Sequence, residues 1–342
     1  MYHPRLKGCP YEMGQKMGKI FLQSQAQFPI QLDSFQMEFG LASAKVLEQV
    51  FPEAASEVKG ITDIIGYNYK QFTAWMMCMG CCLTPIAGAD VEARGCTAFS
   101  FVHQNQLVYG RNNDLPPFLR SVSKSIYYQP KNKYRFILNT SSFINGEEGI
   151  NEAGLVAAMT FVKPHWEEIK PGINSVFLVR YLLENCQNVA EGIIAVNSIP
   201  IASSCNIILI DKTAKMIVAE CHPDMIHLRK PEQNQKGENF IISVNHFTAE
   251  KMKQYDASDR NVYFSQERYQ NAWKALKTND FSDGIAYAKD ILRGKHGFMC
   301  QYNCNLDFDT IWSSVFDITN QKVYRAEGNP LRAKFIKDIR LS

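Results

Sequence analysis

A change of pattern near residue 95 constrains the fold of this chain more than any other feature. Before it, apolar residues recur at three- and four-residue spacing, as on the buried face of a helix. After it, strand-like segments follow one another with short polar turns between them, and helical segments are few. Serial hairpins build antiparallel sheets, whereas a wound parallel sheet needs a helix after every strand. The chain is therefore expected to be α+β.

The N-terminal part is expected to hold three helices, over residues 11–25, 35–51 and 53–69. Pro52 fits the first turn of the third helix, because that turn needs no N–H from the proline. The later segments include expected helices over 174–186 and 265–279 and a buried strand over 240–247. Hairpins are expected over residues 96–114, 123–143, 148–162, 205–223 and 310–330.

Residues 71–89 carry no charge and are long enough to span a bilayer. Gly80, Pro85 and Gly88 interrupt this stretch, so we expect a buried helix followed by a loop and no membrane partner.

Charge and cysteine content limit the partners and the compartment. The 37 basic residues exceed the 34 acidic ones by three, and no block of like charge suggests a nucleic-acid partner. Ten cysteines in 342 residues are too sparse for a disulfide scaffold. The first thirty residues hold no continuous apolar core of a secretory signal. We therefore expect reduced thiols and a cytoplasmic protein.

One hairpin brings reactive side chains together. Cys96 follows Gly95 at the head of a strand, and Arg111 and Asp114 lie 15 and 18 residues later, at the end of the next strand. A hairpin of that length returns its far end to its start, so the three side chains can meet. A guanidinium beside a thiol lowers the pKa of the thiol and so raises the thiolate fraction. Taken alone, a cysteine among apolar residues such as Cys96 is usually an inert core thiol.

Further motifs extend this pattern along nearly the whole chain. They are Arg111-Asn112-Asn113-Asp114, Glu148-Gly149-Ile150-Asn151-Glu152-Ala153-Gly154-Leu155, Val244-Asn245-His246, Ser265-Gln266-Glu267-Arg268, and Pro10-Tyr11-Glu12-Met13-Gly14 with Phe51-Pro52-Glu53 and Lys59-Gly60-Ile61. With these motifs in their order along the chain, the sequence resembles the N-terminal nucleophile hydrolases of the choloylglycine hydrolase group. It is especially similar to the acyl-CoA:6-aminopenicillanic acid acyltransferase (isopenicillin N acyltransferase-like) branch.

The resemblance implies a fold and a division of the chain. The fold would be a four-layer αββα sandwich. A helical prosegment of residues 1–95 would become a small subunit after self-cleavage between Gly95 and Cys96, and residues 96–342 would form the catalytic domain. The resemblance also implies a set of site residues: Cys96, Arg111, Asp114, Asn151, Asn245 and Arg268.

The chemistry of these residue types suits hydrolysis or transfer of an amide's acyl group. Attack of the Cys96 thiol on the Gly95 carbonyl, followed by hydrolysis, would free an α-amine on Cys96. Such an amine has an ordinary pKa of about 7.7–8.0 and can act as the base for its own thiol. The amides of Asn151 and Asn245 are the expected oxyanion donors. Arg111 and Arg268 would tune the thiolate, and Asp114 would hold the amine.

Five alternatives stay open at this point. His246 could be the base, although it and Asn245 would face opposite ways on a strand. Asn151 could simply shape a turn. Zinc could bind the thiols of Cys78, Cys81, Cys82, Cys300 and Cys304. The chain could also be an inactive binding module, or a dipeptidase-like relative with another substrate.

The expected activity is an autoprocessing cysteine amidohydrolase or acyltransferase acting on a linear, non-peptide C–N amide bond. Its partner would be a small-molecule amide or acyl donor, and no cofactor or metal is required. The sequence leaves the substrate open, and it leaves open whether the chain forms a homo-oligomer.

Overall fold

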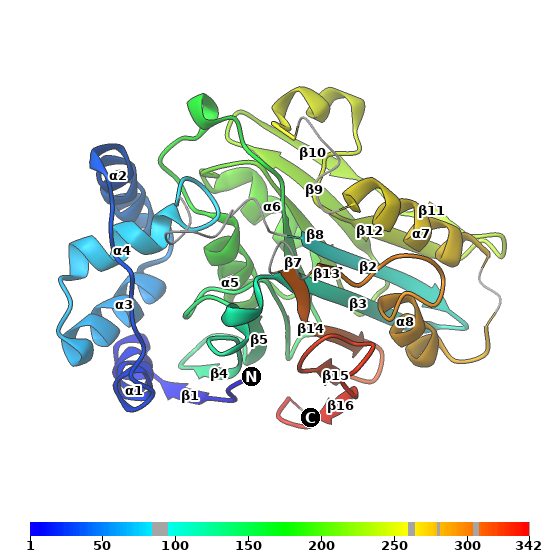
Figure 1. Cartoon of the computed structure of the whole chain (residues 1–342), viewed down its shortest axis with the longest axis horizontal. Helices are drawn as coiled ribbons and strands as arrows, with labels where there is room; N and C mark the ends of the chain where they lie inside the picture. Colours follow the sequence, from blue (N-terminus) through cyan, green and yellow to red (C-terminus); the bar gives the residue numbers. More distant parts are fainter. Residues whose placement is uncertain (84–94, 259–263, 279–280, 304–307, 342) are drawn as a thin grey trace.

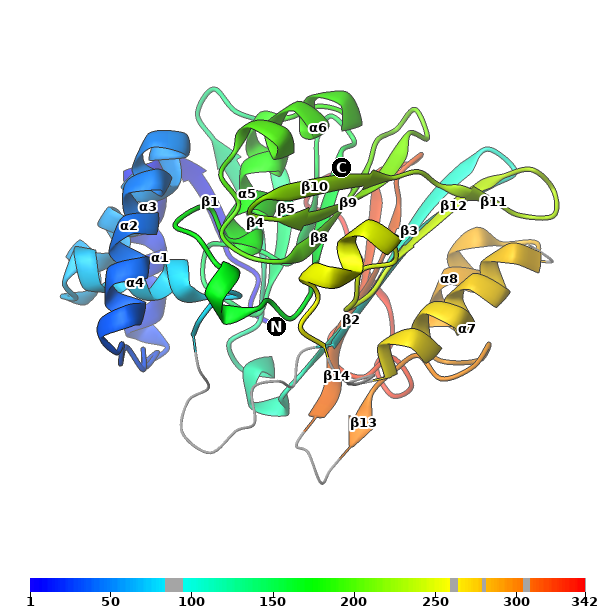
Figure 2. The same ribbon diagram turned by 90° about the horizontal axis from the view of Figure 1, so that it is seen from above.

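The computed structural model describes residues 1–83, 95–258, 264–278, 281–303 and 308–341. Two large sheets lie face to face, with helices on both outer faces and a further group of helices at one end (Figures 1 and 2). The expected α+β class is therefore confirmed.

The N-terminal helices follow the expected periodicity. They are α1 (Pro10–Gln23), α2 (Ser34–Val50), α3 (Pro52–Ile65) and α4 (Tyr69–Cys78). The expectation of one helix over 53–69 was wrong at its end, because Gly66 takes a left-handed conformation (φ 76°) that stops α3. In the part of the chain that the structure describes, no helix is long and apolar enough to cross a membrane.

The first sheet contains mostly antiparallel strands. Its order is β1 (Arg5–Gly8), β4 (Lys124–Pro130), β5 (Phe136–Thr140), β6 (Glu148–Asn151), β7 (Val156–Phe161), β8 (Cys205–Ile210), β9 (Met216–His222) and β10 (Met225–Arg229). The edge strand β1 pairs in parallel with β4, so the N-terminal part contributes a strand to this sheet.

The second sheet carries the hairpin that begins with Cys96. Its order is β11 (Glu232–Gln233), β12 (Asn239–Ser243), β2 (Gly95–His103), β3 (Gln106–Leu115), β14 (Phe308–Asp317), β15 (Lys322–Ala326) and β16 (Ile336–Asp338), and β13 (Tyr302–Asn303) pairs with β14. All five expected hairpins are present. The strand expected over 240–247 ends at Ser243, so Asn245 and His246 lie beyond it.

Apolar side chains fill three spaces between the layers. One core lies under α5 (Ser175–Asn185) and α6 (Val189–Ser198), a second lies between the sheets, and a third lies under α7 (Ser265–Thr278) and α8 (Gly284–Leu292). The order of layers is thus α5/α6, first sheet, second sheet, α7/α8 (Figure 2). This arrangement confirms the expected αββα sandwich.

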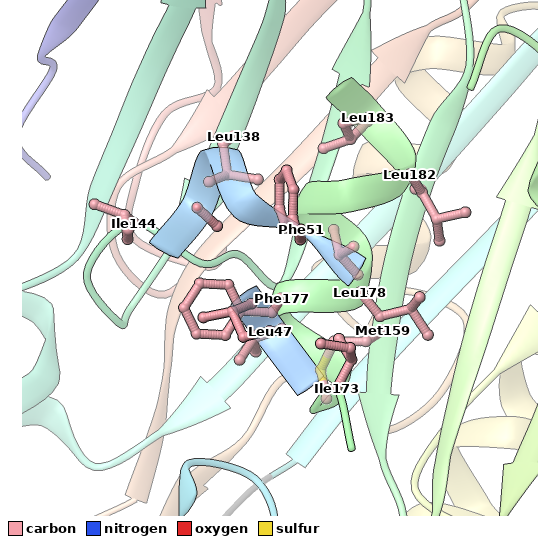
Figure 3. Packing of buried hydrophobic residues seen from close by; sticks show 14 of the residues in the cluster. Leu47, Phe51, Leu138, Ile144, Met159, Ile173, Phe177, Leu178, Leu182 and Leu183 are labelled. Carbon is pink, nitrogen blue, oxygen red and sulfur yellow. The ribbon is translucent and has the colours of Figure 1, made fainter. Parts of the chain in front are cut away.

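The N-terminal helices pack into the first of these cores. Leu47 and Phe51, at the end of α2, pack beside Phe177 and Leu178 of α5 and Leu138 of β5 (Figure 3). These residues are at most 1 % exposed. Residues 1–83 are therefore packed as part of the same body as the sandwich.

Candidate active site

Cys96 lies on a central strand of the second sheet, in register with the far end of its own hairpin. Cys96 pairs with Asn113, and Gly95 pairs with Asp114. Because side chains alternate along a strand, Cys96 and Asn113 point to one face of the sheet and Asp114 points to the other. Arg111 shares the face of Cys96 and reaches across to the first sheet, where its Nη1 donates to the carbonyl of Met159.

The sulfur of Cys96 is held on the face between the two sheets. Arg111 Nη2 lies 3.1 Å from Sγ, and the same nitrogen donates to Asn113 Oδ1 at 2.9 Å. Asn113 Oδ1 is also 3.6 Å from Sγ, within reach of a thiol hydrogen bond. The amide nitrogen of Asn113 donates to the hydroxyl of Ser141, and this hydroxyl also accepts from the ring N–H of Trp312. The guanidinium is therefore fixed against the sulfur from several sides.

The main chain of Cys96 has separate partners near the start of α7. Its N–H donates to Asn245 Oδ1 at 2.7 Å, and its carbonyl accepts from Arg268 Nη1 at 2.5 Å. Arg268 Nη2 also donates to Asn245 Oδ1, which fixes the orientation of that amide. The Asn245 amide nitrogen donates to the carbonyl of Phe161. The structure thus places Asn245 at the nitrogen of the Gly95–Cys96 peptide bond and Arg268 at the carbonyl of Cys96, which belongs to the next peptide bond.

Asp114 lies beside the Gly95–Cys96 bond with one oxygen unsatisfied. Its Oδ1 accepts from the hydroxyl of Thr310 at 2.5 Å. Its Oδ2 is buried and has no hydrogen-bond partner among the described residues. A Cβ added to Gly95 would lie 3.1 Å from this oxygen. A buried carboxyl oxygen without a partner can accept a further hydrogen bond in this position.

Burial dominates the protonation of this site in the unbroken chain. Burial raises the pKa of the Cys96 thiol above its ordinary value, and the charge of Arg111 opposes this rise more than that of Arg268 does. Burial likewise raises the pKa of Asp114 to about 6, while Arg268 and the Thr310 hydrogen bond oppose the change. The thiol and the carboxyl are both held toward their neutral forms while they lack solvent and a nearby amine.

Asn151 does not join this group of residues. Its amide nitrogen donates to the carbonyls of Leu183 and Cys186, and its Oδ1 accepts from the N–H groups of Ala153 and Leu155. All these contacts tie the β6–β7 turn to the end of α5. The expectation that Asn151 is an oxyanion donor is therefore corrected, and the turn interpretation describes its contacts.

His246 also points away from the thiol. Its Nδ1 lies 2.8 Å from the hydroxyl of Ser265, which accepts from the N–H of Asn245. Burial lowers the pKa of His246 below its ordinary value, and Asp256 opposes this effect. Its contacts position the end of β12 against α7, so a Cys96–His246 pair is not formed.

Two polar residues of the site were not anticipated in these roles. Asn113 lies opposite Cys96, and counting back along the hairpin from its turn would have identified it. Glu147 accepts from the N–H of Ser141, and burial raises the pKa of Glu147 to about 6 against the charge of Arg111. No sequence pattern indicated Glu147, because its position depends on pairing between separate hairpins.

The cysteines considered as zinc ligands lie in different surroundings. Cys78, Cys81 and Cys82 are buried beside Phe39, whereas the sulfur of Cys300 lies near the carbonyl of Arg293. Cys304 is outside the described residues. Among the residues that the structure does describe, no group of three or more His, Cys, Asp or Glu side chains is placed to hold a metal ion.

Comparison with known proteins gives one family match. The model of the family described as "Acyl-coenzyme A:6-aminopenicillanic acid acyl-transferase" matches residues 102–332. This range is about two thirds of the chain and includes Arg111, Asp114, Asn245 and Arg268; it begins after Cys96. Among curated protein sequences, none matches this chain.

Solved structures of two kinds of hydrolase are similar to the chain. Penicillin V acylase from Agrobacterium tumefaciens is 18% identical with a TM-score of 0.47, and the alignment covers 72% of this chain and 88% of that one. A variant of the conjugated bile acid hydrolase from Clostridium perfringens is 16% identical with a TM-score of 0.48, over 70% of this chain and 92% of that one. A second variant of that hydrolase is 13% identical with a TM-score of 0.46, over 72% and 93%.

Proposed function

The chain belongs to the acyl-coenzyme A:6-aminopenicillanic acid acyltransferase family, and from this premise we propose that it is an autoprocessing cysteine amidohydrolase or acyltransferase. Its substrate would be a linear, non-peptide amide, and its nucleophile would be Cys96. One observation carries the proposal: the sulfur and the main-chain nitrogen of Cys96 have different polar partners. Arg111 lies 3.1 Å from the sulfur, and Asn245 accepts the N–H at 2.7 Å.

The first step would be self-cleavage. The Cys96 sulfur attacks the carbonyl carbon of Gly95, the C–N bond breaks, and a thioester forms between Gly95 and Sγ. The nitrogen of Cys96 takes the proton that the thiol has lost and becomes a free amine. Water then hydrolyses the thioester, leaving a carboxylate on Gly95 and a thiol on Cys96. The unsatisfied Asp114 oxygen beside this bond supports the step, because it can accept a hydrogen bond from the new ammonium.

The second stage would be turnover through an acyl-enzyme. The α-amine of Cys96 takes the thiol proton, and the sulfur attacks the substrate carbonyl. The proton passes to the departing amine, and a thioester remains on Sγ. Water releases an acid from it, or a second amine takes the acyl group. The Asn245 amide has a second hydrogen besides the one directed at Phe161, and this hydrogen can stabilise the oxyanion.

A screen for trapped acyl groups tests this function. The wild-type protein is mixed with a library of N-acyl amides, quenched in acid and examined by mass spectrometry for an added acyl mass on Cys96. We expect at least one amide to give an adduct whose decay releases the acid. Cys96→Ala should give no adduct, and Cys300→Ala, at another buried thiol, should behave as wild type. Turnover that survives in Cys96→Ala would refute the assignment.

A further inference from the structure

The segment that carries Asn245 lies just beyond the end of β12. The ladder between β12 and β2 ends where Ser243 pairs with Ala98. Continued by two residues, the same register would place Asn245 opposite Cys96, and the ladder would supply a main-chain acceptor for the Cys96 N–H. Instead the chain bends at Asn245, and its side-chain Oδ1 accepts this N–H at 2.7 Å. Other groups must hold the bend, because the ladder no longer does.

Asn206 of β8 reaches from the first sheet to both sides of this bend. Its Nδ2 donates to the carbonyl of Val244 at 2.9 Å and to that of His246 at 3.3 Å. These two residues directly precede and follow Asn245. An amide nitrogen carries two hydrogens, so one buried side chain can hold two carbonyls together. The bridge therefore fixes the main chain on both sides of Asn245.

Thr160 of β7 strengthens the same bridge. It pairs with Asn206 across β7 and β8, so the two side chains lie on one face of the first sheet. The Thr160 hydroxyl donates to the carbonyl of Val244 at 2.6 Å and lies 3.2 Å from Asn206 Nδ2. The carbonyl of Phe161, the next residue of β7, accepts from the Asn245 amide. The first sheet thus holds both the main chain around Asn245 and its side chain.

The second polar atom of the Asn206 amide indicates that stability alone does not explain this side chain. Its Oδ1 is buried and has no hydrogen-bond partner among the described residues. A buried acceptor without a donor keeps the full cost of leaving water. Turning the amide over would not remove this cost, because the oxygen would then face the carbonyls of Val244 and His246. An apolar side chain would avoid the cost but could not bridge the bend.

We propose that Asn206 is a positioning residue of the candidate active site. It holds the bend that directs the side chain of Asn245 at the Cys96 N–H. Asn206 acts through Asn245, by way of the carbonyls on either side of it. The effect on self-cleavage rests on the proposed function, whereas the effect on the hydrogen bond of the Cys96 N–H does not.

The first measurement uses the full-length Cys96→Ala chain, which cannot process itself. Hydrogen exchange of the N–H at position 96 is followed by NMR in this chain, alone and combined with Asn206→Ala or Asn206→Leu. Both substitutions remove the bridge, and one makes the side chain smaller while the other makes it larger. We expect each to speed exchange of this N–H about tenfold, because its acceptor is no longer held in place.

The second measurement follows self-cleavage in chains that keep Cys96. Each chain is made by cell-free translation with a short radiolabelled pulse, and its fragments are separated under denaturing conditions over time. Asn206→Ala and Asn206→Leu should cleave about tenfold more slowly than wild type, because Asn245 no longer fixes the scissile nitrogen. Asn188→Ala is the control, since it lowers stability by removing the N-cap of α6. It should leave both the exchange and the cleavage at wild-type rates.

Unchanged exchange at position 96 in both Asn206 variants would overturn the proposal, and so would wild-type rates of self-cleavage in them. Equal effects in Asn188→Ala would overturn it too, because a general loss of stability would then explain all three variants. If the wild-type chain does not cleave itself, the proposed function fails and the exchange experiment still decides the role of Asn206. A wild-type chain that cleaves, with both Asn206 variants behaving like it, would refute this inference alone.

Discussion

At the scale of single residues, the site separates the two reactive atoms of Cys96. Its sulfur points between the sheets to Arg111, and its main-chain nitrogen faces Asn245 near α7. Asp114 lies beside the same peptide bond, with Oδ2 unsatisfied among the described residues. The unbroken chain thus carries a buried carboxyl oxygen without a hydrogen-bond donor, and breakage of the Gly95–Cys96 bond would supply an ammonium group that can donate to it.

Asp114 should make the unbroken chain less stable as the pH rises. Its pKa in the folded chain, about 6, lies above the ordinary aspartate value of 3.8. The folded state therefore binds the proton more tightly, and this contribution is complete below about pH 3.8 and lost as the pH rises through about 6. In a Cys96→Ala background, Asp114→Asn should raise the free energy of unfolding by about 1–3 kcal/mol near pH 7.5 and by little near pH 4.

Urea unfolding at the two pH values measures this difference. Glu147, whose pKa is also raised, is present in both proteins and cancels in the comparison. Asp63→Asn is a suitable control, because the Lys59 hydrogen bond lowers the pKa of that exposed carboxyl. Asp63→Asn should not raise the free energy of unfolding at the higher pH. A gain for Asp114→Asn that is the same at both values would contradict the titration of Asp114.

Arg111 should control the reactivity of the thiol. Its guanidinium contacts Sγ, Asn113 and the Met159 carbonyl at once, a set of contacts that a lysine ammonium cannot span. In processed protein, Arg111→Lys should slow alkylation of Cys96 by iodoacetamide near pH 7 by about tenfold, since one pKa unit changes the thiolate fraction tenfold. Fragment masses over time give the rates. Arg135→Lys, at an exposed ion pair with Glu152, is the control and should be alkylated at the wild-type rate. If wild type, Arg111→Lys and Arg135→Lys all reacted at the same rate, Arg111 would not control the thiol.

At the scale of elements, the sequence predicted strands well where turns and alternation are local. The β2–β3 hairpin follows from one polar turn and the spacing of Cys96 and Asp114. The role expected for Asn151 was wrong, because its motif indicates only that a turn forms there. Which turns lie near the thiol depends on how the strands pair in the sheets, and the sequence does not show that pairing. Glu147 was missed for the same reason. The helices α6 and α8 were not predicted, because they are short and are stabilised by packing against other elements rather than by their local sequence.

The contact between α1 and α3 depends on glycine. A Cβ on Gly60 would lie 2.2 Å from the carbonyl oxygen of Tyr11, and one on Gly14 would lie 2.0 Å from that of Glu57. Gly60→Ala gains about 1 kcal/mol of helix propensity but must push the two backbones apart. We expect a net loss of about 1–3 kcal/mol in the free energy of unfolding, because backbone atoms cannot move aside as flexible side chains do.

Thermal unfolding of Gly60→Ala measures this loss. Lys19→Ala, on the exposed face of α1, is the control and should stay within about 0.5 kcal/mol of wild type. An unchanged or raised melting temperature in Gly60→Ala would show that the helices are not packed this closely.

At the scale of the whole molecule, a buried ion pair joins the two proposed fragments. Glu57 on α3 accepts from Arg180 Nη2 on α5 at 2.7 Å, and both side chains are fully buried. Tyr128 on β4 donates to the same carboxylate, and Arg180 also pairs with Glu184. Together with β1 at the edge of the first sheet, this contact should keep residues 1–95 bound after cleavage.

Removing one partner of such a pair leaves a buried charge, at a cost of about 3–5 kcal/mol. We therefore expect the processed fragments of wild type to co-elute on gel filtration and those of Glu57→Ala to separate or aggregate. Glu53→Ala removes a half-buried pair with Lys133 across the same boundary and is the control. It should cost less than about 1 kcal/mol and leave the fragments together. If the fragments of Glu57→Ala co-elute as completely as those of wild type, the Glu57–Arg180 pair does not hold the two fragments together.

The intact mass of the purified protein under denaturing conditions tests the central claim most directly. The account predicts two polypeptides, residues 1–95 and 96–342, with Cys96 as the first residue of the second, and a single 342-residue chain for Cys96→Ala. A wild-type protein that stays a single chain after prolonged incubation at neutral pH would contradict it.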